Sequence, residues 1–512
     1  MPNLKSLPKL EDIAREKIIS WLLHCSNNYL GPLNRKIQRA YIESLLGGNL
    51  GQQLLNTVLK TSKNKLDLYS KCLILELLCN QSTLYIDLIQ GGSLIIEEVF
   101  RLYRTLLHCL PVGLARFGLI CDIKPGVDQR YITDVNSFFY RILGQMKNLR
   151  SISLVGVGDT EILKQIGLNC EQLEYLDVTN SWKVNDRSVA CLLYESPNIC
   201  HNKSIEQLIG IDDDLNMCCF NLRFIGLSGT DISNKSIAMC FINCPRVVSF
   251  GGYIHQGSVT NILELVQSKL VKRKYNIREL WEDKISESQV ELLSYACPLL
   301  TSLSTSSESL YTIHNLSSLT SLTLDCDFQD WNEELYTYLL SNGSKLKSLK
   351  LNDNVNCKLD IGWLMELTPS LVTLSAHVYY SNVGYPVTWS SLQNADIVVD
   401  SSKCVHELLI HTPEIENLNL KFVGEPYCED ETSINDDLMI DIATYGGLHK
   451  AKNIKIGVCG LGIVAVETLL AYCSDLQSIS TLSLWKNFTA EHLNELEKRV
   501  KEANWDLKLI FY

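Results

Sequence analysis

Residues 173–178 read LEYLDV, and residues 222–227 read LRFIGL. Both segments begin with an apolar residue, leave two variable positions, and return to apolar residues at the fourth and sixth positions. Because successive side chains of a β-strand point to opposite faces, the residues at positions four and six share one side. The pattern therefore predicts a short strand that buries this side in a core.

The same pattern recurs from about residue 146 to residue 512. Clear copies begin at Leu149, Leu173, Leu222, Leu319, Leu346, Ile415 and Ile479, and weaker ones at Val247, Ile277, Leu300 and Leu371. Spacings such as the 24 residues from Leu149 to Leu173 are typical of leucine-rich repeats. A single repeat cannot bury its own apolar side, so neighbouring repeats must stack. The sequence predicts an α/β leucine-rich-repeat solenoid over residues 146–512, with short parallel strands on the concave face and helices on the convex face.

Four cysteines mark boundaries between repeats. Cys170, Cys244 and Cys297 each lie three residues before the apolar residue that opens the next repeat, and Cys473 does so if the last repeat opens at Leu476 instead of Ile479. This spacing resembles the cysteine-containing leucine-rich repeats of substrate receptors in cullin-RING ubiquitin ligases. The resemblance covers most of residues 146–512 and implies a protein that binds other proteins.

The composition is that of a folded, acidic protein. Its 512 residues include 46 basic and 58 acidic side chains, which gives a formal charge of −12. Non-specific nucleic-acid binding needs clustered Lys and Arg, so we expect a protein partner and no nucleic acid. The sequence shows no signal peptide and no apolar stretch long enough to span a bilayer. We therefore expect no membrane contact, a cytoplasmic or also nuclear location, and reduced thiols among the 19 cysteines.

Residues 1–60 lack the strand pattern and predict a helical box ahead of the repeats. Leu7-Pro8 precedes a first helix over residues 10–23. A second helix follows Pro32 and is expected to end at Gly47-Gly48, because glycine commonly terminates helices. A third short helix is predicted over residues 50–59.

Two short helices joined by a proline-containing turn resemble the adaptor-binding boxes of cullin-ligase receptors. Five residues correspond to the elongin-binding box of the VHL and SOCS type: Leu10, Ala14, Ile18, Pro32 and Ile37. This arrangement is most similar to receptors related to Zyg11 and Zer1, and it implies elongin B/C and a cullin as partners. Leu7-Pro8 followed by an apolar helix is similar to an F-box, which would imply Skp1 and a cullin. The remaining alternative is a plain helical cap over the first repeat.

Residues 61–145 are apolar and favour helices. Leu66-Asp67-Leu68 followed by Cys72 matches an eroded repeat, and a helical connector is the alternative. The sequence leaves both interpretations open.

Small polar side chains predominate at the strand positions expected on the concave face, with single aromatic and charged residues among them. We expect a protein ligand to contact Tyr175, Asp177, Phe224, Trp281, Asp325, Lys350 and Lys421. Aromatic residues exposed in a polar surround are typical anchors for a protein or peptide. The alternative is that Phe224 or Trp281 turns inward in an irregular repeat.

The sequence offers little for catalysis. Residues 460–465 read GLGIVA, a dinucleotide-binding fingerprint between a predicted strand and a predicted helix. Only about 50 residues follow it, too few for the rest of a doubly wound sheet, so a repeat unit is the favoured interpretation. No Cys-x-x-Cys pair, P-loop or nucleophile elbow is present. We predict a non-enzymatic protein with no catalytic residue, no metal and no cofactor.

Two hypotheses for function follow. In the favoured one, the chain is the substrate-recognition subunit of a cullin-RING E3 ubiquitin ligase and binds its target on the concave face. In the other, it is a leucine-rich-repeat interaction scaffold without a ligase role, and residues 1–60 only cap the solenoid.

Overall fold

The computed structural model of the protein describes residues 10–28, 32–62, 65–109, 111–123, 129–195, 197, 203–209, 219–269, 273–325, 332–352, 358–381, 387–423, 434–457 and 459–511. The chain divides into two compact units. Among the described residues, the N-terminal unit comprises those of 10–281 and 292–300. The C-terminal unit comprises those of 282–291 and 301–511.

The N-terminal unit begins with three helices, α1 (Leu10–Asn28), α2 (Pro32–Lys60) and α3 (Leu68–Leu78). The expected helix end at Gly47-Gly48 is wrong, because α2 continues through both glycines. Glycine costs a helix interior about 1 kcal/mol relative to alanine. Burial of Leu54, Leu55 and Val58 in the second half of α2, which packs on α3, outweighs that cost.

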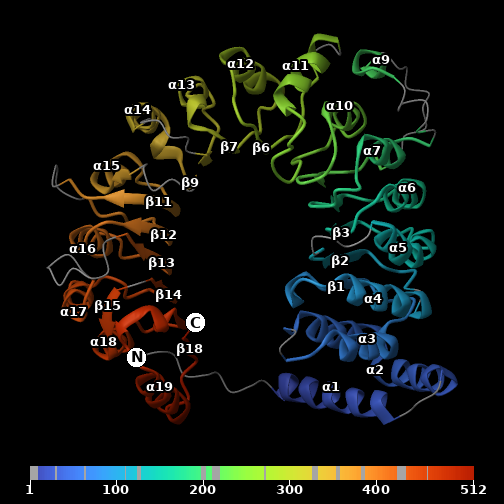
Figure 1. Ribbon diagram of the computed structural model, residues 1–512, viewed down its shortest axis with the longest axis horizontal. Helices are drawn as coiled ribbons and strands as arrows, with labels where there is room; N and C mark the ends of the chain where they lie inside the picture. The colour runs from blue at the N-terminus through green and yellow to red at the C-terminus, as the bar shows by residue number, and fades with distance from the viewer. Residues whose placement is uncertain are drawn as a thin grey trace. The chain divides into compact units, whose positions relative to one another are not determined.

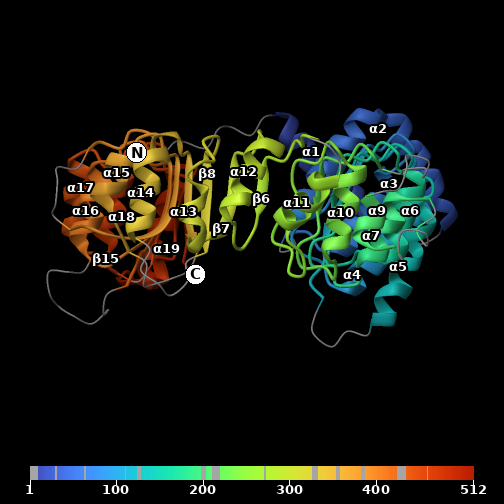
Figure 2. The ribbon, with the colours of Figure 1, turned by 90° about the horizontal axis from the view of Figure 1, so that it is seen from above.

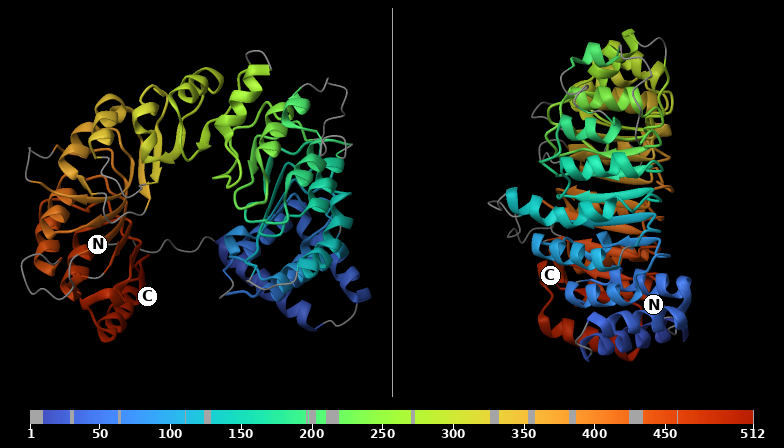
Figure 3. Two further views of the ribbon diagram at one scale, coloured as in Figure 1. Left: turned by 45° about the horizontal axis from the view of Figure 1, so that its top comes forward. Right: turned by 90° about the vertical axis from the view of Figure 1, so that its right-hand side faces the viewer.

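Five parallel strands form one sheet in this unit, in the order β1-β2-β3-β4-β5. They are β1 Tyr85–Asp87, β2 Arg116–Ile120, β3 Ser151–Val155, β4 Tyr175–Asp177 and β5 Phe224–Gly226. The connecting helices are α4 Ile96–Cys109, α5 Gln129–Leu143, α6 Thr160–Asn169, α7 Asp186–Leu193, α9 Ile205–Ile209, α10 Asn234–Asn243 and α11 Val259–Lys269. Helices α4 to α7 lie on one face of the sheet, and the blue-to-green helices stack one above another (Figures 1 and 3).

Residues 61–145 contribute β1 and β2 to this sheet, so strand–helix units extend toward the N-terminus beyond the region of clear sequence repeats. Strand β6 (Glu279–Trp281) follows α11, and α12 (Glu287–Ala296) contains the division between the two units.

Each repeat of the N-terminal unit buries the same apolar positions. Leu173, Leu176 and Val178 are fully buried, and so are the matching residues of the repeats that open at Leu149 and Leu222. Burying one such side chain stabilises the fold by about 1.5–3 kcal/mol. Buried polar groups also join neighbouring repeats, since Asp159 caps α6 and accepts a hydrogen bond from Asn136 at 2.8 Å.

The C-terminal unit is a second parallel sheet, in the order β18-β16-β14-β13-β12-β11-β9-β8-β7, with β10 paired to β11 off this path. Its strands are β7 Ser302–Ser306, β8 Ser321–Asp325, β9 Ser348–Asn352, β10 Lys358–Asp360, β11 Thr373–Tyr379, β12 Asn394–Val399, β13 Asn417–Phe422, β14 Asn453–Ile456, β16 Ser478–Ser480 and β18 Lys508–Ile510. A separate pair of strands is formed by β15 Cys459–Gly462 and β17 Trp485–Asn487.

The helices of the C-terminal unit are α13 Leu310–Ile313, α14 Asn332–Asn342, α15 Ile361–Leu367, α16 Ser402–Ile410, α17 Asp436–Thr444, α18 Ile463–Tyr472 and α19 Ala490–Glu502. Helices α13 to α17 lie on one face of the sheet and leave the opposite face without helices (Figure 1); Figure 2 shows the same helices from above. The predicted α/β leucine-rich-repeat solenoid is therefore confirmed, and we call the helix-free side of each sheet the strand face.

The repeat-boundary cysteines end helices. The backbone N–H groups of Cys170, Cys244 and Cys473 each cap a helix by donating to a carbonyl of its last turn. Burial raises the pKa of the Cys170 thiol to about 12. These thiols therefore act as small buried groups that allow close packing at the turn into the next strand.

Candidate functional site

On the strand face of the N-terminal unit, an aromatic pair stands out. The register of β4 and β5 places Tyr175 opposite Phe224, and their rings stack with centroids 4.4 Å apart and planes 5° apart. Both side chains are half-buried, and burial raises the pKa of the Tyr175 hydroxyl. The sequence singled out each residue separately, and the structure joins them into one apolar platform.

Asp177 lies next to this platform and is oriented by its own repeat. Its carboxylate accepts hydrogen bonds from the Thr179 N–H at 3.1 Å and the Ser153 hydroxyl at 3.4 Å. Gly226 faces it on the neighbouring strand, where a Cβ atom would come within 2.6 Å of the Asp177 Oδ1 atom. The glycine leaves room for the carboxylate beside the aromatic pair. Trp281 ends β6 and is half-buried.

The strand face of the C-terminal unit carries a continuous row of amides. Asn417 donates to Asn394, Asn453 donates to Asn417, and Ser478 donates to Asn453, each at 2.7 Å. A shallow cavity of about 660 Å³ opens over this row. Because the side chains of this row hydrogen-bond to one another, many of their donors and acceptors are already satisfied.

The three predicted contact residues of this unit are exposed on different strands. Asp325 on β8 accepts a hydrogen bond from Asn352 at 2.7 Å. Lys350 lies on β9 beside Ser375 of β11 and lines the cavity over the amide row. Lys421 lies near the end of β13, away from the residues that line this cavity. The structure therefore does not bring Asp325, Lys350 and Lys421 together.

The N-terminal helices expose an apolar stripe. Ile37, Tyr41 and Leu45 succeed one another at four-residue intervals on α2 and are 62%, 59% and 59% exposed. Residues spaced by four share one face of a helix. On α1, Ile13 and Trp21 are also exposed. We call Ile37, Tyr41 and Leu45 the N-terminal stripe.

The predicted adaptor-box residues fall in different environments. Ile37 belongs to the N-terminal stripe, Ala14 is exposed and Ile18 is half-buried on α1. The side chains of Leu10 and Pro32 lie outside the described residues. Sequence reasoning missed Tyr41 and Leu45 as exposed residues, although their spacing from Ile37 is a helical signal.

The glycine-rich fingerprint forms a repeat element in which a carboxylate occupies the helix start. Gly460 and Gly462 lie in β15, and Gly462 directly precedes α18. The Asp436 Oδ1 atom accepts the Gly462 N–H at 2.8 Å and the Ala465 N–H at 3.3 Å. These are the backbone donors that a nucleotide pyrophosphate would need. A negative carboxylate therefore stands where the fingerprint would place a phosphate.

A buried histidine forms the most catalytic-looking cluster of the C-terminal unit. The His377 Nε2 atom lies 2.6 Å from Asp400 Oδ1, and the Lys358 Nζ atom lies 2.6 Å from Asp400 Oδ2. Burial opposes ionisation of Asp400, but hydrogen bonds from Lys358 and His377 hold its pKa below the usual value. The cluster ties β10 and β11 to the end of β12. Across the described residues, no group of three or more His, Cys, Asp or Glu side chains is arranged to hold a metal ion.

No protein-family model and no curated protein matches the chain. Among solved structures, that of the Rad7 and Elc1 complex in yeast matches at 16% identity over 49% of this chain and 62% of the other, with a TM-score of 0.30. An internalin from Listeria monocytogenes matches at 13% identity over 72% and 82%, with a TM-score of 0.31. The TLR13–ssRNA13 complex matches at 10% identity over 84% and 62%, with a TM-score of 0.38.

The chain spans less than two thirds of the first and third of these proteins. The fold assignment rests on the strand register and buried positions of this chain itself, which define a leucine-rich-repeat fold. Among the helices that the structure describes, none combines the length and the apolar character needed to cross a bilayer.

Proposed function

We propose that this chain is a non-enzymatic substrate-recognition subunit of a cullin-RING E3 ubiquitin ligase. Its N-terminal helices would bind the adaptor, elongin B/C, and its strand faces would bind the protein to be modified. The proposal extends to a cytoplasmic location, with the nucleus as an alternative, where adaptor and cullin are present.

The N-terminal stripe is the observation that carries this proposal. A solenoid needs a terminal cap with a polar outer face, because the first repeat otherwise leaves its core open to water. Here α1 and α2 cover the first repeat with Leu22, Ile42, Leu54 and Leu55, which are buried. A plain cap does not require Ile37, Tyr41 and Leu45 to remain exposed on the other face. An exposed apolar stripe on a helix is the form in which helical partners are recognised.

The proposed mechanism is proximity. A receptor that holds its target close to a ubiquitin-charged enzyme raises the effective concentration of the target lysine and supplies no acid, base or nucleophile. The buried thiols and the carboxylate at the start of α18 agree with such a role. No cofactor is required.

Co-purification from cells tests the adaptor half of the proposal. Tagged full-length protein should recover elongin B/C and a cullin. The double substitution Tyr41→Ser and Leu45→Ser should reduce this recovery at least tenfold, because it removes two of the three side chains of the stripe. Both residues are exposed, so the thermal unfolding midpoint should change little.

Leu340→Ser with Tyr445→Ser is the matched control, since these residues are 64% and 69% exposed in the C-terminal unit. The control should retain full recovery. Skp1 in place of elongin B/C would assign the F-box alternative. The ligase role would be overturned if the wild type recovers no adaptor, or if both double variants recover it equally, and the scaffold hypothesis would then stand.

A further inference from the structure

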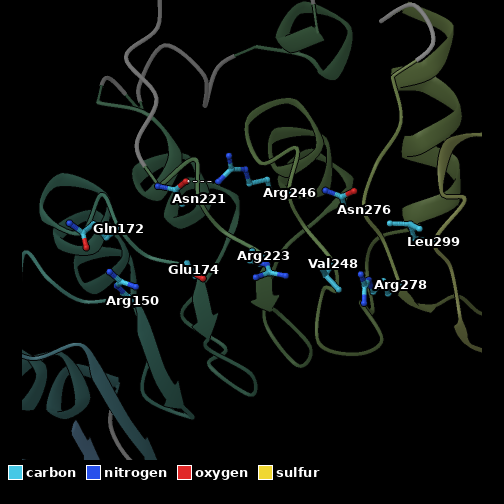
Figure 4. A pocket seen from close by; sticks show the side chains of 10 residues that line it. All are labelled: Arg150, Gln172, Glu174, Asn221, Arg223, Arg246, Val248, Asn276, Arg278 and Leu299. Atoms are coloured by element: carbon cyan, nitrogen blue, oxygen red, sulfur yellow. Dashed lines mark hydrogen bonds between the residues drawn. The ribbon is translucent and has the colours of Figure 1, made fainter. Parts of the chain in front are cut away.

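A groove with four arginines runs along one edge of the N-terminal unit, where the strands begin (Figure 4). Its volume is about 650 Å³, and Arg150, Arg223, Arg246 and Arg278 line it together with one acidic residue, Glu174. Four positive charges against one negative give a local excess of three. The chain as a whole carries a formal charge of −12, so the excess of positive charge in the groove is opposite in sign to the net charge of the chain.

The repeat itself builds this groove. Arg150, Glu174, Arg223, Val248 and Arg278 each follow the apolar residue that opens a repeat, and Figure 4 shows them in a row. Backbone hydrogen bonds join the row: Glu174 N–H donates to Arg150 O at 2.8 Å, Arg223 N–H to Glu174 O at 2.8 Å, and Arg278 N–H to Val248 O at 2.9 Å. The positions of the arginines are therefore fixed by the strand register.

The second row of the groove supplies uncharged hydrogen-bonding groups. Asn221 and Asn276 each precede the opening apolar residue of their repeats, and both line the groove. The Arg246 guanidinium donates to the Asn221 Oδ1 atom at 3.2 Å, which orients both side chains. The partner of Arg246 is therefore an uncharged amide, which orients the guanidinium group without neutralising its charge as a carboxylate would.

Two of the arginines have no counter-ion among the described residues. The side chains of Arg150 and Arg223 form neither a hydrogen bond nor an ion pair with the residues that the structure describes, and Glu174 between them is in no ion pair there either. Guanidinium groups present paired N–H donors that match carboxylate and phosphate oxygens. Arg150 and Arg223, which precede strands two apart in the sheet, therefore form a site for an anionic ligand.

We propose that this groove binds a phosphorylated serine or threonine segment of a partner protein. A phosphate group carries close to two negative charges and three strong acceptor oxygens, which several arginines and amides can satisfy together. Strands are spaced about 4.8 Å apart, so Arg150 and Arg223, which are two strands apart in the row, are separated by about 10 Å along it. An extended peptide covers this distance in about three residues. The groove thus suits a phosphate followed by an acidic residue three positions away.

A peptide fits this groove better than a nucleic acid does. Val248 and Leu299 line it alongside the arginines and can contact apolar side chains of a peptide. Single-stranded nucleic acids are bound by basic channels with aromatic side chains on which bases stack, and no aromatic residue lines this groove among those described. The proposal rests on the protein-binding half of the proposed function and is independent of adaptor binding.

Peptide binding to the purified full chain tests the proposal. The probe is a library of fluorescent peptides with a central phosphoserine or phosphothreonine, varied flanking residues, and unphosphorylated counterparts. Phosphorylated peptides, with a preference for Asp or Glu three residues after the phosphate, should bind at least tenfold more tightly. The double substitution Arg150→Gln and Arg223→Gln should remove this preference, and added salt should weaken the binding.

Lys450→Gln with Lys452→Gln is the matched control, because these lysines occupy equivalent edge positions in the C-terminal unit but are paired with glutamates. The control variant should keep the preference for phosphorylated peptides. Circular dichroism should show that both variants retain the wild-type fold. The proposal is overturned if phosphorylation does not affect binding, if the arginine variant retains the preference, or if a single-stranded oligonucleotide binds more tightly than every peptide. Adaptor co-purification is a separate readout, so failure of either proposal can be recognised without the other.

Discussion

The same edge of the repeat is open to ligands in one unit and closed by ion pairs in the other. In the C-terminal unit, Glu414 pairs with Lys450 at 2.6 Å and Glu416 with Lys452 at 2.8 Å, across two neighbouring repeats. These residues flank the apolar positions in the same way as the groove residues of the N-terminal unit, and Lys452 N–H donates to Glu416 O as Arg223 N–H donates to Glu174 O. The backbone is equivalent, and only the charges differ.

The strand faces of the two units also differ in how far their polar side chains are already paired with one another. The N-terminal unit presents the stacked Tyr175 and Phe224 beside Asp177, whereas the C-terminal unit presents a row of asparagines bonded to one another. A surface whose polar groups are already paired gains less from a partner than one with unpaired groups. The repeat thus determines where a side chain lies, and the residue type at that position determines whether it contributes to stability or to recognition. We therefore propose that recognition is concentrated in the N-terminal unit.

The largest expected effect concerns the reactivity of buried cysteines, which shows whether the interiors of the two units are equally closed to solvent. Burial raises the pKa of the Cys170 thiol in the N-terminal unit and of the Cys473 thiol in the C-terminal unit to about 12. At pH 8 this leaves about a thousandfold less thiolate than an exposed cysteine would have. Iodoacetamide labelling followed by mass spectrometry should therefore leave both residues unmodified in the native protein and modify both in urea.

The sign of the pH effect follows from the same shift. A thiol whose pKa is raised on folding stabilises the native state fully below about pH 8.5, and this contribution is lost as the pH rises toward 12. Stability should accordingly fall in alkaline solution. Rapid native labelling of Cys170 but not Cys473 would show that the interior of the N-terminal unit is open.

The next effect concerns the apolar positions that both units bury. Leu176→Ala and Leu418→Ala remove the fourth residue of the strand pattern in the N- and C-terminal units, where these leucines are 0% and 2% exposed. Each should lower the free energy of unfolding by about 2–5 kcal/mol. Urea unfolding followed by circular dichroism measures both, and a loss below about 1 kcal/mol in either unit would break the equivalence of their cores.

A smaller effect is expected when a carboxylate is added to the arginine groove, so that this edge resembles the ion-paired edge of the C-terminal unit. Val248→Glu places a carboxylate between Arg223 and Arg278, which imitates the pairing of Glu416 with Lys452. We expect phosphopeptide affinity to fall about tenfold, which corresponds to about 1.4 kcal/mol, with little change in stability. Fluorescence anisotropy gives the affinity, and Val248→Thr is the control for loss of the apolar contact. Equal affinities for wild type and Val248→Glu would contradict the role of the groove charge.

The smallest effect is expected at the closed edge. Glu416→Gln removes one carboxylate of a surface ion pair, which contributes about 0.2–1 kcal/mol. Thermal unfolding should shift by no more than a few degrees, and high salt should remove most of the difference between wild type and variant. A larger, salt-independent loss would mean that this pair holds the repeats together.

The sequence predicted those features that depend on local periodicity. The strands at Leu173, Leu222 and Leu319 were identifiable because three apolar residues at fixed spacing decide which side of a strand is buried. The repeat-boundary cysteines were identifiable for the same reason, since each directly follows a helix and precedes the next strand at a fixed distance.

Features that depend on contacts between repeats escaped prediction. The helix through Gly47-Gly48 persists because later residues of α2 pack on α3. The arginine groove assembles residues from five repeats of unequal length, and a 49-residue gap separates Leu173 from Leu222. A recurring Arg directly after the opening apolar residue, at positions 150, 223 and 278, was a readable signal once the register was known. The contact of the Asp436 carboxylate with the start of α18 had no sequence signal, because Asp436 begins α17 and lies 26 residues before Gly462.

The most direct test of recognition by the N-terminal unit is cross-linking mass spectrometry. The complex for this experiment is purified from cells through the tagged full chain. We expect an adaptor to cross-link to residues 10–60 and a phosphorylated partner to cross-link to residues 129–300. Cross-links from both partners confined to the C-terminal unit, or their absence from the N-terminal unit, would contradict this expectation.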